Sequence, residues 1–252
     1  VFVSYGLESV RYGDDGLLGT ITTNSCAGGL RSTVGIDLSR DTRLDMPFPT
    51  EGQLQSIGAQ LNGGPLGGSA TFQRYTAEAR SYTVIGRIGG TKPGSQPLRL
   101  TFGLSGRTGF VFGDAGDFFY SQQFSLGGVQ FGEMLRGYPE FSITPTGFTS
   151  STGTFNAQRQ SFGSAFFAST AEIGLRFNSS VYVNAFYDAG NLWARPRDFD
   201  PTRLFRGSGI GVSTVTPLGP LGIDWAYGFD RRDGNGRPDP RWQLHFRLGQ
   251  IF

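Results

Sequence analysis

Trp242-Gln-Leu-His-Phe-Arg-Leu-Gly-Gln-Ile-Phe252 alternates apolar with polar residues and ends on an aromatic carboxy-terminal residue. Because successive side chains of a β-strand point to opposite sides, the alternation divides this segment between two faces. One face comprises Leu244, Phe246, Leu248 and Phe252, and the other Gln243, His245, Arg247 and Gly249. The segment is therefore predicted to be a strand with one face in an apolar environment.

The same alternation recurs along the chain, and each apolar face is opposed by a face that carries charge and glycine. This pattern is typical of transmembrane barrels with a polar interior. We therefore expect an all-β protein, an antiparallel transmembrane β-barrel over residues 1–252 with about ten strands. The expected strands are residues 1–12, 31–39, 52–62, 71–85, 97–112, 163–178, 180–193, 204–216, 221–229 and 242–252.

Composition is compatible with this class without proving it. Only 37% of the residues are hydrophobic, 14% are aromatic, and 40 are glycine, figures that a soluble β-sandwich could also show. No run of about 18 apolar residues suggests a membrane helix, and a closed barrel is the other arrangement that satisfies backbone groups in lipid. A net charge of +2, spread along the chain, gives no patch suited to nucleic acid. Cys26, the single cysteine, is expected to be an incidental loop thiol.

The connections alternate between short turns and longer loops rich in glycine and aspartate. Residues 178–180 and 217–222 are short turns, whereas 13–30 and 230–241 are longer loops. Barrels with tight turns on one side of the membrane and extended loops on the other show this alternation. The segment 113–162 is far longer than an ordinary connection, and such loops are usually functional or disordered.

Alternation also assigns the side chains of each strand to lipid or lumen. It directs Glu172 into the lumen from one strand, and Phe186 and Asp188 from the next. A buried carboxylate is costly unless it is paired, so we expect an arginine partner nearby. The residues expected to face lipid in these strands and in 221–229 are Ala165, Phe167, Ala171, Ile173, Leu175, Phe177, Val181, Val183, Ala185, Tyr187, Leu221, Ile223, Trp225, Tyr227 and Phe229.

A series of short motifs, in order along nearly the whole chain, resembles the BamA-type outer-membrane assembly family. In the long segment, Phe124-Ser-Leu-Gly-Gly128 and Leu135-Arg-Gly-Tyr138 resemble the family's Gly-Gly and [V/L]-R-G-[F/Y] signatures. Each motif alone is weak, but their collinear order makes chance improbable. The other matching stretches are Asp41 to Gly52, Gly64 to Gly68, Phe186 to Trp193, Gly207 to Gly211 and Ser213 to Pro220.

The resemblance implies that the long segment folds back into the lumen and is anchored there by Arg136. In the family this arginine contacts the inner wall, here at Asp188 and Glu172, with Phe186 alongside. A guanidinium suits this role because its planar fork meets carboxylates bidentately and stays charged. Gly137 permits the tight turn. The implied loop anchor comprises Leu135, Arg136, Gly137, Tyr138, Glu172, Phe186 and Asp188.

The chain departs from the family in length, since BamA-like barrels have sixteen strands and the strands here match only the last ten. Either the sequence is a fragment of a longer chain or the barrel is reduced. We favour the fragment, because an unpartnered first strand leaves an edge that lipid cannot satisfy. No signal peptide precedes Val1, which also suggests that an amino-terminal part is missing. The closing strand, residues 242–252 from Trp242 to Phe252, would supply one side of the family's lateral seam.

Catalytic and metal-binding interpretations have little support. His245 is the single histidine, and no Ser-His-Asp spacing surrounds it. Residues 103–109 resemble a phosphate loop superficially but lack its lysine, and residues 230–239 lack the terminal glutamate of a calcium loop. We therefore expect no enzyme activity, no metal and no cofactor.

Two functional hypotheses remain. The first, implied by the resemblance, is a bacterial outer-membrane machine that inserts other β-barrels at a seam beside its last strand. Its partners would be outer-membrane lipids and lipopolysaccharide, unfolded outer-membrane proteins and periplasmic assembly lipoproteins. The second is a pore, either a two-partner-secretion translocator or a general porin. Large steady currents in planar bilayers would favour the pore, and upstream POTRA repeats would favour assembly or polypeptide export.

Overall fold

The computed structural model describes residues 1–10, 29–90, 92, 94, 97–115, 122–150, 160–178, 180–217 and 219–248. Its main element is a ten-stranded antiparallel sheet in which each strand pairs with its neighbours in chain order. The strands are β1 (Phe2–Val10), β2 (Gly29–Asp41), β3 (Gly52–Asn62), β4 (Thr71–Ile88), β5 (Leu98–Asp114), β10 (Ala165–Arg176), β11 (Val181–Trp193), β12 (Phe205–Thr216), β13 (Gly219–Gly228) and β14 (Arg241–Leu248).

These ten strands confirm the ten expected segments and the all-β fold class. Where both bounds are described they shift by at most three residues, and the largest shift extends β4 from residue 85 to Ile88. Cys26 and the end of the closing strand, Gly249 to Phe252, lie outside the described residues. The described residues contain no helix with the length and apolar character that a membrane crossing requires.

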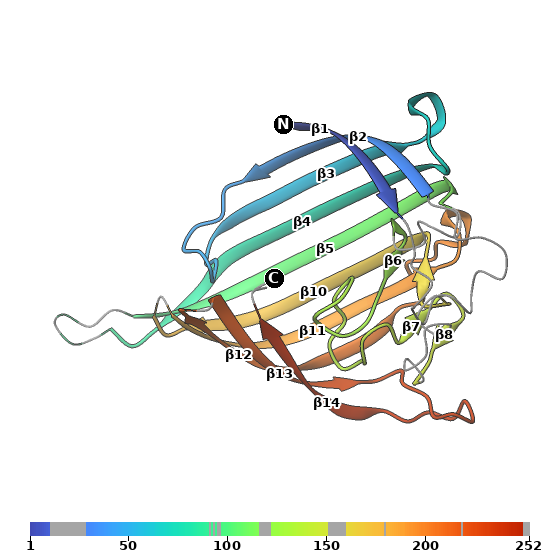
Figure 1. Cartoon of the computed structure of the whole chain (residues 1–252). Coiled ribbons are helices and arrows are strands. Elements are labelled where there is room, and N and C mark those ends of the chain that lie inside the picture. The colour runs from blue at the N-terminus through green and yellow to red at the C-terminus, as the bar shows by residue number, and fades with distance from the viewer. Residues whose placement is uncertain are drawn as a thin grey trace.

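The sheet curves around a hollow, and its described strands form no closed ring. Figure 1 shows the sheet wrapping from β1 to β14 around residues 122–150, which lie between β5 and β10 in the chain. Among the described strands, β1 pairs only with β2 and β14 only with β13, so both edges of the sheet are open. The sequence did not predict the smaller elements, which are η1 (Gly64–Leu66), β6 (Phe124–Ser125), β7 (Ile143–Thr144), β8 (Gly147–Phe148), β9 (Phe162–Gly163) and η3 (Pro196–Asp198).

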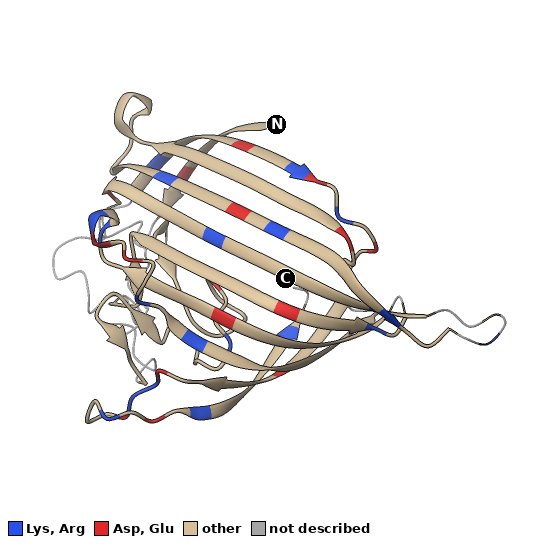
Figure 2. Cartoon of the chain, turned by 180° about the vertical axis from the view of Figure 1, so that it is seen from behind, with Lys and Arg blue, Asp and Glu red and all other residues tan. Residues whose placement is uncertain are grey.

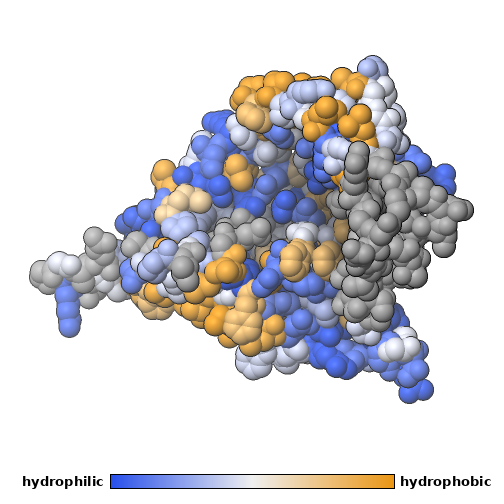
Figure 3. Space-filling model, viewed as in Figure 1, coloured by the Kyte–Doolittle hydropathy of each residue, from blue (hydrophilic) through white to orange (hydrophobic). Residues whose placement is uncertain are grey.

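Large apolar side chains cover the outer face of the sheet. Ile173, Ile210 and Trp225 are each about half exposed, as expected of side chains that meet lipid rather than a protein core. Figure 2 shows charged residues as isolated bands on the strands, and Figure 3 shows hydrophilic residues lining the hollow. The two faces therefore differ as the alternation predicted.

Ala165 is an exception to the predicted facing. It is fully buried rather than exposed to lipid. Its register partners on the two neighbouring strands are Phe110 and Trp193, and Phe199 packs against both rings at 5.2 Å and 4.7 Å. This aromatic cluster covers the small side chain, because the connection after β11 folds back over the outer wall.

The hydrophobic core lies on the inner face, between the sheet and the long segment. The lumen is therefore less polar than the alternation predicted, because the inserted segment brings its own apolar side chains to the wall. Its buried members are Phe72, Val111, Ala115, Phe124, Leu126, Leu135, Tyr138, Ile143, Phe166, Ala168 and Leu192.

The turn between β2 and β3 folds inward at the other end of the hollow. Phe48 is fully buried and stacks on Tyr182, with ring centroids 5.3 Å apart. Asp45 accepts hydrogen bonds from Thr50 and Arg99, both at 2.5 Å, and pairs with Arg176 at 3.5 Å. The Thr50 hydroxyl, together with the two guanidiniums, lowers the pKa of Asp45 below its usual value. The turn is thus tied to β5 and β10.

The facing of β12 is testable by placing a charge in the apolar outer wall. We expect Ile210→Arg to lower the free energy of unfolding by about 2–4 kcal/mol, the cost of a guanidinium on the lipid face near mid-membrane. Urea titration in lipid vesicles, followed by tryptophan fluorescence, measures this change. Ile210→Leu is the control and should have little effect. A loss below about 1 kcal/mol for the arginine variant would place Ile210 away from lipid.

Candidate functional site: the luminal loop anchor

Residues 122–150 of the long segment lie against the inner face of the sheet (Figure 1). β6 pairs with β9, so the segment leaves and rejoins the wall close together. Within it, Gly128 and Leu135 form a bridge in which the Leu135 N–H donates to the Gly128 carbonyl at 3.0 Å. The bridge closes a short hairpin, residues 128–135, and Arg136 follows directly at its base.

Arg136 makes a bidentate ion pair with Asp188 of β11. Its Nε and Nη2 each donate to a different carboxylate oxygen of Asp188 at 2.7 Å, and its backbone N–H donates to the same carboxylate at 3.1 Å. Thr170 of β10 adds a fourth donor at 2.8 Å. The two charged side chains are 0% and 1% exposed, so the pair is strongly coupled in a water-poor environment.

Phe186 and Asp224 complete the surroundings of the guanidinium. The guanidinium carbon of Arg136 lies 3.3 Å from the centroid of the Phe186 ring, a cation–π contact. Its Nη1 lies 3.7 Å from Asp224 of β13, which also pairs with Arg247 of β14 at 2.6 Å. Two arginines and two aspartates therefore form a buried cluster with no net charge, contributed by the loop and three strands.

Glu172 does not contact Arg136 through a hydrogen bond or an ion pair in the described structure, which corrects the contact implied by the family resemblance. Its carboxylate instead accepts hydrogen bonds from the Tyr182 hydroxyl at 2.9 Å and from the Asn184 amide at 2.8 Å. The register agrees with this difference, because Glu172 lies opposite Phe186, whereas Asp188 lies opposite Thr170.

Glycines of β12 and β13 let the anchor approach the wall closely. Gly207 and Gly228 lie opposite each other on these strands. A Cβ on Gly207 would lie 2.1 Å from the Arg136 carbonyl oxygen, and one on Gly228 would lie 2.4 Å from the Gly137 carbonyl oxygen. Gly137 has φ +90 and itself packs against the backbone of Gly228. The wall and the loop thus meet backbone to backbone.

The residues that flank Arg136 extend the contact toward the last strands. The Gly137 N–H donates to Nε2 of His245 in β14 at 2.9 Å, and the Tyr138 hydroxyl donates to the Arg206 carbonyl of β12 at 2.8 Å. Leu135 is fully buried in the luminal core. The structure therefore brings Leu135, Gly137 and Tyr138 to the wall together with Arg136.

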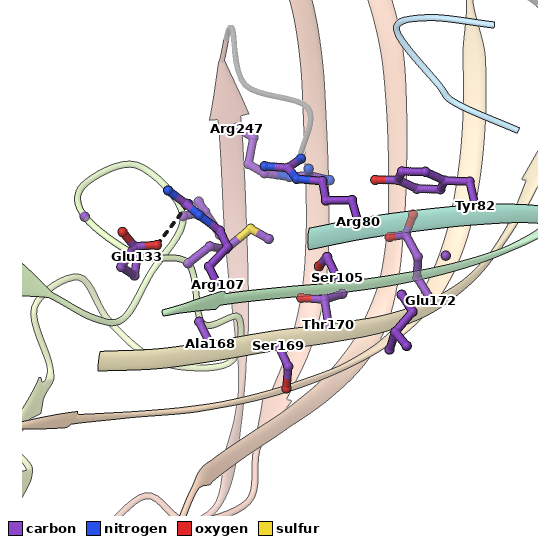
Figure 4. A pocket seen from close by; sticks show the side chains of 15 residues that line it. Arg80, Tyr82, Ser105, Arg107, Glu133, Ala168, Ser169, Thr170, Glu172 and Arg247 are labelled. Carbon is purple, nitrogen blue, oxygen red and sulfur yellow. Dashed lines mark ion pairs between the residues drawn. The ribbon is translucent and has the colours of Figure 1, made fainter. Parts of the chain in front are cut away.

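The same segment also contacts β4 and β5, in the middle of the sheet. Figure 4 shows a pocket in which Arg107 of β5 pairs with Glu133 of the loop at 2.9 Å. Arg74 of β4 donates to the Gln122 carbonyl at 3.1 Å and stacks 4.6 Å from the centroid of the Phe124 ring. The loop therefore bridges the middle of the sheet and its final strands.

The closing strand carries its predicted apolar residues on the outer face. Leu244, Phe246 and Leu248 are more than half exposed, and Trp242 packs beside Trp225 and Tyr227 at 4.7 Å and 5.4 Å. Of the residues proposed for this strand, Gly249 and Phe252 lie outside the described residues.

Sequence reasoning missed three participants in the anchor. Asp224, His245 and Arg247 all lie on strand faces that the alternation directs into the lumen, so their direction was available from the sequence. Their association with Arg136 was not, because it depends on the register of β13 and β14.

The ion pair should contribute strongly to the stability of the folded barrel. We expect Arg136→Ala to lower the free energy of unfolding by about 3–5 kcal/mol, because it leaves Asp188 buried without its partner. Arg136→Lys should restore only part of this loss, since an ammonium lacks the planar fork. Heat-modifiable gel mobility of both variants, Asp188→Ala and the double mutant measures the coupling. Strictly additive losses would show that the two residues do not interact.

The glycine contact can be tested separately from the charges. Gly207→Ala should lower the free energy of unfolding by about 1–3 kcal/mol, because the added methyl group displaces the Arg136 carbonyl. The matched control is Gly106→Ala in β5, where a Cβ would meet nothing within 4 Å. Urea titration compares the two variants, and equal effects would contradict close packing of the loop on β12.

Comparisons with known proteins agree with this architecture. Residues 5–252 match the model of the Omp85 superfamily domain. The chain is 22% identical over 226 residues to the outer membrane protein assembly factor BamA of Nitratidesulfovibrio vulgaris, an alignment that covers 88% of this chain and 26% of that protein. The chain thus spans about a quarter of that relative's length.

A solved structure has the same fold. The crystal structure of BamA from Haemophilus ducreyi lacking POTRA domains 1–3 superposes with a TM-score of 0.59 at 18% identity, over 96% of this chain and 49% of that chain. At this identity the likeness concerns the fold alone. The family match over almost the whole sequence shows that the chain belongs to the Omp85 superfamily of bacterial outer-membrane β-barrel proteins.

Proposed function

We propose that this chain is the part of an outer-membrane assembly factor that accepts strands of unfolded β-barrel proteins beside its last described strand, β14. The observation that carries the proposal is the pattern of β14, in which the residues whose backbone groups point away from β13 also carry the apolar side chains of the outer face. The proposed activity requires backbone hydrogen bonding and no catalytic residue or cofactor.

The hydrogen-bond pattern determines which groups of β14 point to the open edge. The Phe229 N–H donates to the Arg206 carbonyl, so residues 221, 223, 225 and 227 of β13 direct their backbone groups to β12. The intervening residues bond to positions 241, 243, 245 and 247 of β14. The backbone N–H and C=O groups of Trp242, Leu244, Phe246 and Leu248 therefore point away from β13.

This edge suits an incoming transmembrane strand. The residues whose backbone groups point away from β13 carry the apolar side chains of the outer face. A client strand with the same alternation could extend the sheet in register, with its own apolar face in lipid. Contacts with lipopolysaccharide and periplasmic lipoproteins remain predictions of the family resemblance.

The pore alternative receives less support from the geometry. Residues 122–150 occupy the hollow, and a neutral buried charge cluster holds them at the inner wall. A general porin would instead need an open, water-filled passage. A polypeptide translocator would require this segment to move. Large steady currents through protein with the segment intact would favour a pore.

Disulfide trapping can test strand acceptance directly. We expect Leu244→Cys to cross-link to single cysteines placed along an unfolded eight-stranded outer-membrane protein during its insertion into vesicles that contain this chain. The matched control is Ile210→Cys, which is similarly exposed on the outer face, 57% against 53%, but lies inside the sheet. Equal cross-linking at the two positions would contradict acceptance at the edge.

A further inference from the structure

The connection between β11 and β12, residues 194–204, lies against the outside of the sheet. Phe199 directly follows η3, and its ring centroid lies 5.2 Å from that of Phe110 in β5 and 4.7 Å from that of Trp193 in β11. β10 separates these two strands in the sheet, so the connection crosses the outer side of β10 to reach β5. Figure 1 shows the connection in orange beside the ends of β5 and β10. It therefore rests on the face of the wall that meets lipid.

Aromatic side chains mark the depth of this connection in the membrane. Phe110 stacks on Phe112 with ring centroids 6.3 Å apart, and Tyr75 of β4 meets Phe112 edge-on at 6.0 Å. A second aromatic group, Trp225 and Trp242 on β13 and β14, lies at the same end of the sheet. Bands of aromatic residues mark the boundary between hydrocarbon and headgroups, and the longer loops of such barrels lie outside the membrane. The connection 194–204 thus lies at the depth of the headgroups of the outer leaflet.

Two arginines at η3 share one carboxylate. Arg195 lies 3.1 Å and Arg197 3.8 Å from Asp198, and their side chains are 60% and 71% exposed. In both pairs the nearest guanidinium nitrogen is Nε, and the terminal nitrogens donate no hydrogen bond to any residue that the structure describes. The third arginine, Arg203, has its own carboxylate in Asp200 at 3.4 Å. The connection thus carries three arginines and two aspartates, and the excess positive charge belongs to the pair that shares Asp198.

We propose that Arg195 and Arg197 bind a phosphate group of the glycolipid in the outer leaflet. The terminal nitrogens of a guanidinium form a planar fork that meets two phosphate oxygens, and Asp198 balances only half of the charge of the pair. Phe199 holds the pair beside the lipid. This binding is independent of strand acceptance beside β14, and it gives the expected contact with lipopolysaccharide a defined location.

Lipid binding can be measured on the folded chain in detergent micelles. The probes are bisphosphorylated lipid A, which is the membrane anchor of lipopolysaccharide, and the same lipid with both phosphates removed. Native mass spectrometry of a titration gives the Kd of each lipid. We expect the original chain to bind the phosphorylated lipid more tightly. Equal affinity for the two lipids would overturn phosphate recognition, and this comparison requires no variant.

The double variant Arg195→Gln/Arg197→Gln tests the two arginines. It should bind the phosphorylated lipid about 30-fold more weakly, which corresponds to about 1 kcal/mol for each arginine near an anionic membrane surface. Its affinity for the dephosphorylated lipid should stay the same. Both side chains are exposed, so we expect the heat-modifiable gel mobility of the original chain. An affinity for the phosphorylated lipid that stays within about twofold would overturn the site.

Arg232→Gln/Arg237→Gln is the matched control, because it removes the same charge from another outer loop. Arg232 forms a bridge with Pro238, and the Asp233 N–H donates to the Arg237 carbonyl at 2.9 Å. These contacts extend the hairpin of β13 and β14 beyond the aromatic band, away from the lipid. The control should therefore keep the original affinity. Equal losses in the two double variants would show general charge attraction and overturn the site.

Inorganic phosphate distinguishes a lipid site from a site for a soluble anion. At constant ionic strength, an excess of inorganic phosphate should leave lipid A bound, because only the lipid is also held in the micelle beside the aromatic band. Displacement of lipid A by millimolar inorganic phosphate would assign the arginines to a soluble anion and overturn lipid recognition.

Discussion

The buried charge of Arg136 is the constraint on which the arrangement of the lumen depends. A guanidinium that is fully shielded from water requires an equally buried carboxylate and further donors for that carboxylate. Asp188 is that carboxylate, and Thr170 and the Arg136 backbone also donate to it. Asp224 in turn balances the charge of a second buried arginine, Arg247. The loop must therefore lie against β11, β12 and β13, and glycines there leave room for its backbone.

This docking also gives the curved sheet an interior. A single layer of strands has no core of its own, and the apolar side chains of the inner face would otherwise line an open hollow. Leu126, Leu135 and Ile143 from the loop bury Phe166 and Leu192 from the wall, whereas the outer face keeps its apolar residues for lipid. The loop thus performs the packing that a second sheet performs in a soluble sandwich.

The sequence predicted every strand of the main sheet and the inward direction of Glu172, Phe186 and Asp188, because both follow from the period of two. It could not predict which carboxylate forms the ion pair with Arg136. This pairing depends on the register of β10 and β11, which places Thr170 opposite Asp188, and on the donors Tyr182 and Asn184, which bind Glu172. The position of Gln130 in the hairpin 128–135 was equally inaccessible, because it depends on a turn with positive φ at Gly128 and on its contact with Glu140.

One hairpin of the luminal segment connects the Arg136 anchor with the last described strand. The hairpin 128–135 carries Gln130, whose amide donates to the Phe246 carbonyl, and leads directly to Arg136 at its base. The Gly137 contact with His245 joins the same hairpin to the inner face of β14. The loop thus contacts β14 at a side chain and at a backbone carbonyl, and these two contacts tie the last described strand to the luminal anchor.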